Sequence, residues 1–130
     1  MTRTKLPPAK AWRERNVADW NTVSFTEYLR DHHAELYGLP YVPAKSWKAE
    51  MGMIKRMIDE FGPEVVKRFI DESFREYRPT REYPAPTFTF MFTYMRSRNL
   101  PKALRESERV ARDEKAEVSA MSAEELVDWL

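Results

Sequence analysis

Seven basic side chains around an aromatic segment are the residues of this chain best suited to binding a charged partner. Arginine presents planar N–H donors that match phosphate and carboxylate oxygens. Tyr77, Tyr83 and Tyr94 are interleaved with the basic residues, and no acidic residue occurs from 94 to 105. This pattern predicts contact with nucleic-acid phosphates or an acidic protein surface, provided that the fold gathers the residues at one end. The seven are Arg75, Arg78, Arg81, Arg96, Arg98, Lys102 and Arg105.

The same region also fits an ordinary, charge-balanced protein surface. Glu76 and Glu82 lie beside the arginines in the sequence. Acidic neighbours of this kind neutralise part of the positive charge, so the choice between the two interpretations depends on how the side chains pair in the fold.

Residues that catalysis or metal binding would require are sparse. His32 and His33 are adjacent, and neighbouring helical residues point about 100° apart, which disfavours shared coordination of one metal ion. Cysteine is absent, and the three glycines are isolated from one another. A thiol nucleophile and a glycine-rich phosphate loop are therefore excluded. We expect a protein that is not an enzyme, with no catalytic residue, metal site or cofactor.

The C-terminal residues form a second candidate binding element. A highly charged stretch from 102 to 117 precedes the sequence Glu-Leu-Val-Asp-Trp-Leu. Large apolar residues at the tip of a charged segment predict a peptide that completes its burial on a protein partner. Docking of the segment on its own domain is the alternative. The candidate partner-binding residues are Leu126, Val127, Asp128, Trp129 and Leu130.

The segment from Glu125 to Leu130 resembles the sliding-clamp-binding peptides of phage replication and late-transcription proteins, which end in a Leu-Asp-aromatic-Leu type of sequence. The small late-transcription coactivators of T-even-type phages have a similar layout. In that family a compact helical body binds the flap of host RNA polymerase, and the C-terminal peptide binds the phage sliding clamp. The resemblance implies that the five terminal residues, Leu126 to Leu130, contact a sliding clamp or a polymerase subunit.

Composition is typical of a small helical protein. The chain has 130 residues, of which 33% are charged, and only 3 are glycine. The formal net charge of +1 gives no overall attraction to nucleic acid or membranes, although the first residues are basic and the last are acidic. No stretch approaches the ~20 apolar residues of a membrane span, and no signal-peptide core is present. We expect a monomer without membrane contact, located in the cytoplasm, or in the host cytoplasm if the chain is phage-encoded.

Three helices are predicted in the first part of the chain, after a basic N-terminal arm that Trp12 or Trp20 holds to the body. Ser24 and Glu27 predict a capping box, followed by an apolar stripe that ends before Gly38. A second helix is predicted from 46 to 61, and a third follows from Pro63. The predicted stripe of the first helix contains Phe25, Tyr28, Leu29, His32 and Leu36.

The segment from 87 to 94 alternates as a strand would, yet it also fits a helix capped by Thr87. We favour the helix, because no other segment reads as a strand that could pair with it. This helix is expected to be apolar nearly all round and to end at Leu100–Pro101. The charged stretch from 102 to 117 is expected to contact the body little, and Ser122 with Glu125 predicts a separate short helix in the tail.

The sequence therefore predicts an all-α bundle of about four helices. The expected parts are a basic arm (1–20), a helical domain (21–101), a charged spacer helix (102–117) and a binding tail (118–130). The expected function is that of a phage adaptor, which recruits or coactivates RNA polymerase by linking it to a DNA-bound partner such as a sliding clamp. The alternatives are a DNA-binding replication accessory protein, such as a helicase loader, and an inhibitor of a host enzyme.

Overall fold

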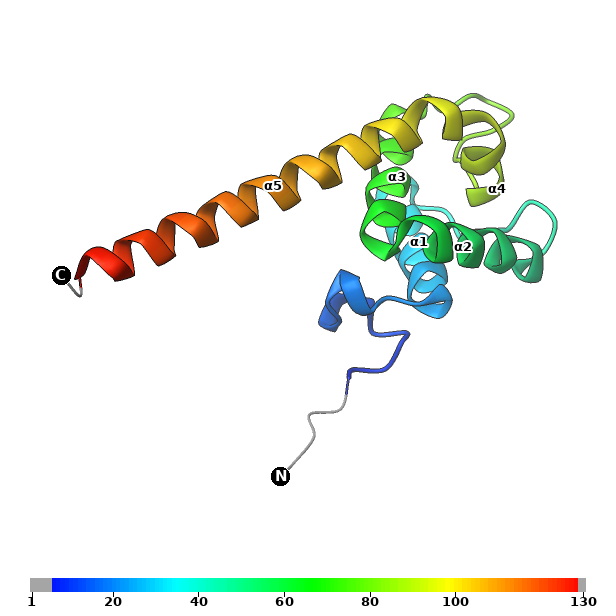
Figure 1. Ribbon diagram of the computed structural model, residues 1–130. Helices are drawn as coiled ribbons and strands as arrows, with labels where there is room; N and C mark the ends of the chain where they lie inside the picture. The colour runs from blue at the N-terminus through cyan, green and yellow to red at the C-terminus, as the bar shows by residue number, and fades with distance from the viewer. Residues whose placement is uncertain (1–5, 129–130) are drawn as a thin grey trace.

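A computed structural model describes the backbone of residues 6–128 and the side chains of residues 6–121. Every regular element in these residues is helical, which confirms the all-α class. Figure 1 shows a compact body from which α5 projects as a long single helix. In chain order, the elements are η1 (Trp12–Glu14), η2 (Val17–Asp19), α1 (Thr22–Tyr37), α2 (Trp47–Phe61), α3 (Pro63–Glu76), α4 (Phe88–Phe90), η3 (Met91–Met95) and α5 (Arg96–Asp128). Of these, η1 and η2 are 3₁₀ turns, and η3 is a π-helical turn.

Local signals set the bounds of α2 and α3, as predicted. The Ser46 side chain accepts a hydrogen bond from the Ala49 N–H at 3.1 Å and caps α2. Gly62 then adopts a φ of 88°, a conformation that L side chains rarely take, and its N–H donates to the Ile58 carbonyl at 2.8 Å. Pro63 starts α3 at a position where a missing N–H costs nothing.

Helix α1 starts earlier than predicted; Phe25, Tyr28 and Leu29 of its predicted stripe are buried, but the last part of the stripe is not. Asn21, not Ser24, is the cap: its side chain accepts from the Ser24 N–H at 3.1 Å, and the Ser24 side chain accepts from the Asn21 N–H at 3.3 Å. The predicted Ser24–Glu27 box is therefore wrong. His33 is buried, whereas Leu36, expected in the core, is 51% exposed. Gly38 ends the helix with a φ of 65°, as predicted.

The N-terminal arm is held to the body by the two tryptophans, as the sequence indicated. The Trp12 indole N–H donates to Asp31 at 2.7 Å, and Trp20 is buried. The Trp12, Trp20 and Tyr28 rings meet with centroids between 4.9 and 5.8 Å apart. Aromatic pairs of this kind add to the free energy gained by burial alone.

Helix α3 is the centre of the body, since it packs against both α2 and α5. Its stripe of Val66, Phe69, Ile70 and Phe74 is buried as predicted. The segment from 88 to 95 is helical, which confirms the choice of helix over strand, and Thr87 caps it through the Phe90 N–H. The expectation that this segment is central to the core on all sides is wrong, because Phe90 and Tyr94 lie on the surface.

Helix α5 does not end at Leu100–Pro101, and Ser122 does not begin a new helix. Proline removes one backbone hydrogen bond, but packing against α3 holds the helix across it. The buried Asn99 side chain donates to Ser73 Oγ at 3.2 Å, and Ala103 is buried one turn later. The expectation that residues 102–117 contact the body little is wrong for the first turns, because Ala103 is buried and Lys102 pairs with Glu72 and Glu76 on α3. Beyond Ser107, every described side chain except the half-buried Val110 is exposed, as expected of the spacer. Within residues 6–128, no helix has the length and apolar character needed to cross a bilayer.

Candidate nucleic-acid interface

Two adjoining cavities lie where the end of α3, the loop after it and the turn η3 meet. The first, here called the arginine cavity, has a volume of about 730 Å³. The second, the aromatic cavity, has a volume of about 410 Å³. Tyr77, Phe90 and Tyr94 line both. The fold therefore joins a basic hollow and an aromatic hollow in one continuous surface.

Arg75, Arg78 and Arg98 line the arginine cavity, so the fold brings together three of the seven predicted basic residues. Glu76 also lines it and pairs with Arg98 at 3.1 Å and with Lys102. The hydrogen bond from Lys102, together with the positive charge of Arg98, lowers the pKa of the Glu76 carboxyl. These pairs join α3 to α5, and they neutralise part of the positive charge.

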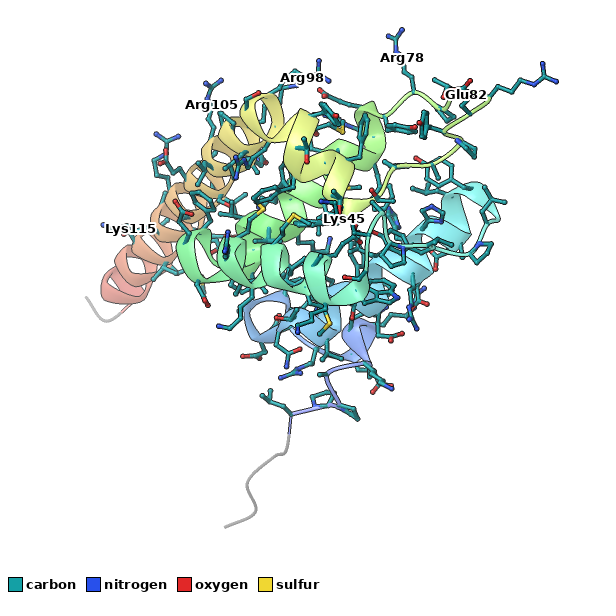
Figure 2. The ribbon with its side chains drawn as sticks, turned by 90° about the vertical axis from the view of Figure 1, so that its right-hand side faces the viewer. Lys45, Arg78, Glu82, Arg98, Arg105 and Lys115 are labelled. Carbon is teal, nitrogen blue, oxygen red and sulfur yellow. The ribbon has the colours of Figure 1, made fainter. Side chains whose placement is uncertain are left out.

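Four of the predicted basic residues make no ion pair with any described residue: Arg78, Arg81, Arg96 and Arg105. All four are exposed. Figure 2 shows Arg78, Arg98 and Arg105 along one edge of the molecule, with Glu82 near Arg78. Three of the seven predicted basic residues therefore lie along one edge, and their role in binding stays a prediction.

Arg75, Lys102 and Arg96 make contacts within the fold. Arg75 pairs with Glu72 at 2.6 Å, and Lys102 approaches the same carboxylate at 3.7 Å. The Arg96 guanidinium lies over the Phe92 ring, 4.1 Å from its centroid. Arg75 and Lys102 therefore act mainly within the fold, and Arg98 pairs with Glu76, whereas Arg78 and Arg105 lie exposed along this edge without an ion pair to a described residue.

The aromatic cavity is shaped by the loop between α3 and α4. The Tyr77 hydroxyl donates to the Tyr83 carbonyl, and the Tyr83 N–H donates to Thr80 Oγ1 at 3.0 Å. These bonds fix the loop so that the Tyr83 ring, 68% exposed, stands at the cavity. Tyr94 is 72% exposed and packs against Phe90 with a centroid separation of 5.1 Å. Two large rings are thus held at the surface on a fixed support.

Glu50 positions one wall of the aromatic cavity from inside the protein, and the sequence analysis missed it. Its side chain is fully buried and accepts hydrogen bonds from the Thr89 N–H at 3.0 Å, from the Thr89 hydroxyl at 2.6 Å and from the Tyr41 hydroxyl. Tyr41 in turn accepts from the Phe88 N–H at 2.8 Å. A signal was available, because Glu50 lies three residues after Trp47 and four before Ile54, on the apolar face of α2.

No protein-family model, curated protein or solved structure matches this chain.

The predicted binding tail lies at the limit of the described residues. The backbone is helical as far as Asp128, whereas the side chains of Leu126, Val127 and Asp128, and both Trp129 and Leu130, lie outside the described residues. The prediction that these five residues bind a partner stays a prediction.

Both histidines have contacts within the fold. His32 stacks on Tyr28 with a centroid separation of 5.2 Å, and His33 Nδ1 lies 3.0 Å from the Leu39 carbonyl oxygen. In the part of the chain that the structure describes, no three potential metal ligands come together.

Proposed function

We propose that this protein is a non-enzymatic adaptor of nucleic-acid-processing machinery, acting in the cytoplasm or in that of a phage host. Its helical body contacts nucleic acid through the basic edge formed by Arg78, Arg98 and Arg105. Its projecting helix presents the C-terminal residues to a protein partner. One observation carries the proposal: α5 supplies Arg98 and Arg105 to the basic edge and continues out of the body without a break.

The charge arrangement supports contact with a polyanion. Arg78 and Arg105 are exposed and make no ion pair with described residues, so their contact with a phosphate breaks no existing pair, whereas Arg98 would exchange Glu76 for the phosphate. Release of counterions makes the affinity fall with salt, with a slope of about −0.9 for each duplex phosphate contacted. Three arginines correspond to a slope of about −3.

Fluorescence anisotropy at several salt concentrations tests this contact, using a labelled single strand and a labelled duplex of the same sequence. We expect binding that weakens steeply with salt. The double variant Arg78→Ala, Arg105→Ala should bind more weakly and show a smaller slope. Arg56→Ala on α2 is the matched control, since Arg56 is exposed and lines a different face. An equal loss in the control variant, or binding that is insensitive to salt, would contradict the proposal.

A second candidate function is that of a coactivator that links RNA polymerase to a sliding clamp. The resemblance of Glu125–Leu130 to clamp-binding peptides favours it, as does the direction of α5 away from the body in Figure 1. A purified phage sliding clamp should bind the full chain and not a chain ending at Ala120 or the variant Trp129→Ala. Equal binding by all three would exclude the tail as the contact, and a lower unfolding temperature in Trp129→Ala would indicate that the ring is part of the core.

A further inference from the structure

We infer that the aromatic cavity holds an unstacked base of a single-stranded nucleic acid, while the arginine cavity holds the neighbouring phosphates. The protein then prefers single strands to duplexes. This inference rests on the proposed contact with nucleic acid and specifies which form of nucleic acid the body binds.

The size and walls of the aromatic cavity suit a flat, partly apolar group. Its volume of about 410 Å³ lies within the range of roughly 300–1,000 Å³ that small-molecule sites occupy. Tyr83, Phe90 and Tyr94 line it with aromatic rings, and Thr93 adds a hydroxyl that can hydrogen-bond the edge of a base. Every base has a π face, so stacking on aromatic side chains is a general way to hold single strands.

Tyr83 and Tyr94 are both held exposed at the aromatic cavity, as a binding site for a flat ring would require. Tyr94 is 72% exposed and Tyr83 is 68% exposed, although the body has an apolar core that could have covered them. The fold instead holds them outward: Phe90 packs on Tyr94, and hydrogen bonds between Thr80 and Tyr83 fix the loop. Large rings held in place at the surface indicate a binding site more than an accident of packing.

The shared wall between the cavities supplies the third argument. Tyr77, Phe90 and Tyr94 line both hollows, so a group in the aromatic cavity lies directly beside Arg78 and Arg98. A nucleotide joins a flat ring to a negative phosphate by a short sugar, and it can therefore reach into both hollows at once. An acidic peptide would pair with the arginines but would leave the exposed rings without a role.

Bases inside a duplex do not have access to such a site. They are stacked and paired, and reaching a concave pocket would require one of them to be extruded. Duplex phosphates still reach the arginines of the exposed edge. The expected result is tight binding to single strands and weaker, purely electrostatic binding to duplexes.

Three probes test the inference with the full chain: a labelled single strand, the matching duplex, and a single strand of abasic nucleotides that keeps the phosphates. The single strand should bind roughly tenfold more tightly than the other two. Tyr94→Ala should lose that preference, whereas Tyr94→Phe, which keeps the ring, should retain it. Arg78→Ala should weaken all three probes. Leu36→Ala is the control, because Leu36 is an exposed apolar residue on α1, which lines neither cavity.

The outcomes separate this inference from the proposed function. Equal binding of the three probes, unchanged by Tyr94→Ala, would overturn the base-binding site and leave the electrostatic contact standing. Absence of binding to every nucleic-acid probe at low salt would overturn both. Tighter binding of polyglutamate than of the single strand would also overturn the inference, in favour of an acidic protein surface.

Discussion

At the scale of single residues, the buried carboxylate of Glu50 joins three segments that are far apart in the sequence. It accepts hydrogen bonds from Tyr41 before α2 and from Thr89 in α4. Together with Tyr41 and Thr87, it satisfies the first N–H groups of α4, which have no partner within the helix. A negative group at this end of a helix is also favoured by the helix dipole.

Glu50→Ala should therefore destabilise the fold strongly. The buried Tyr41 hydroxyl and the two donors of the half-buried Thr89 would lose their acceptor, and leaving a buried group unpaired costs about 1–3 kcal/mol before any relaxation. We expect a loss of roughly 3 kcal/mol in the free energy of unfolding, measured by urea titration. Glu60→Ala, at an exposed site on the same helix, should change stability little. A loss equal to that of Glu60→Ala would mean that water replaces the carboxylate.

Two buried tyrosines predict how stability depends on alkaline pH. Burial raises the pKa of Tyr41, and the nearby Glu50 carboxylate adds to the shift; burial and the hydrogen bond to Asp71 raise the pKa of Tyr28. The native state thus keeps both protons at a pH where the unfolded chain releases them.

The free energy of unfolding should accordingly be fully retained below about pH 10, the ordinary tyrosine pKa, and should fall as the pH rises above it. Phenolate absorbance and circular dichroism, followed together in an alkaline titration, check this. Part of the absorbance change should coincide with unfolding. Ionisation of every tyrosine before any loss of helical signal would contradict the prediction, and Tyr41→Phe should reduce the dependence on pH.

At the scale of elements, the passage of α5 through Pro101 is the main departure from the expected fold. A proline inside a helix removes one hydrogen bond and crowds the preceding turn, at a cost of roughly 3 kcal/mol. The packing of Asn99 and Ala103 against α3 offsets that cost. The π-helical turn η3 lies just before, and Figure 1 shows that the helix axis changes direction between α4 and α5.

Pro101→Ala should stabilise the protein, because the backbone N–H is restored and Ala favours the helix. Pro101 is exposed, so no packing is lost. We expect a gain of about 1–3 kcal/mol in the free energy of unfolding, measured by urea titration. Leu100→Ala is a useful comparison, since it shortens a half-buried side chain in the same turn and should destabilise. A loss of stability in Pro101→Ala would mean that the proline sets the direction of α5.

Local signals explain which elements the sequence was able to predict. The Ser46 cap and the Gly62–Pro63 turn lie next to the helices that they bound, so the limits of α2 and α3 are readable from short segments. The continuation past Pro101 depends on the contact between Asn99 and Ser73, which are 26 residues apart, and no local pattern reveals that contact. The same applies to the site, where the arginines and tyrosines are visible in the sequence but their pairing and the role of Glu50 are not.

At the scale of the whole molecule, the protein consists of a packed body and an exposed helical arm, which is the part of α5 after Ser107 and is distinct from the N-terminal arm. In the arm, Arg109 pairs with Glu106 and with Asp113, the latter at 2.8 Å. Pairs of this kind on an exposed helix each contribute only about 0.2–0.5 kcal/mol. In the free protein, the amides of this arm are therefore expected to be much less protected against hydrogen exchange than the amides of the body.

Hydrogen exchange measures this difference directly. Amides from 108 to 121 should exchange much faster than those from 47 to 74, which belong to the buried core, while amides from 98 to 106 should exchange at intermediate rates. A dilution series is the control, since slow exchange in the arm that disappears on dilution would indicate self-association. Slow exchange at all concentrations would contradict the picture of an uncovered arm.

Because α5 is unbroken, it fixes the direction in which its far end faces as well as the distance of that end from the body. Each helical residue advances about 1.5 Å and turns about 100°, so a continuous helix fixes the rotational phase of its far end relative to the body. Inserting one residue into the arm would swing the tail to a different side. Inserting seven would lengthen the arm by about 10 Å while nearly preserving its phase. With one inserted residue, a molecule held at the tip would be turned by about 100° relative to a nucleic acid held on the body, whereas with seven it would keep nearly the same orientation.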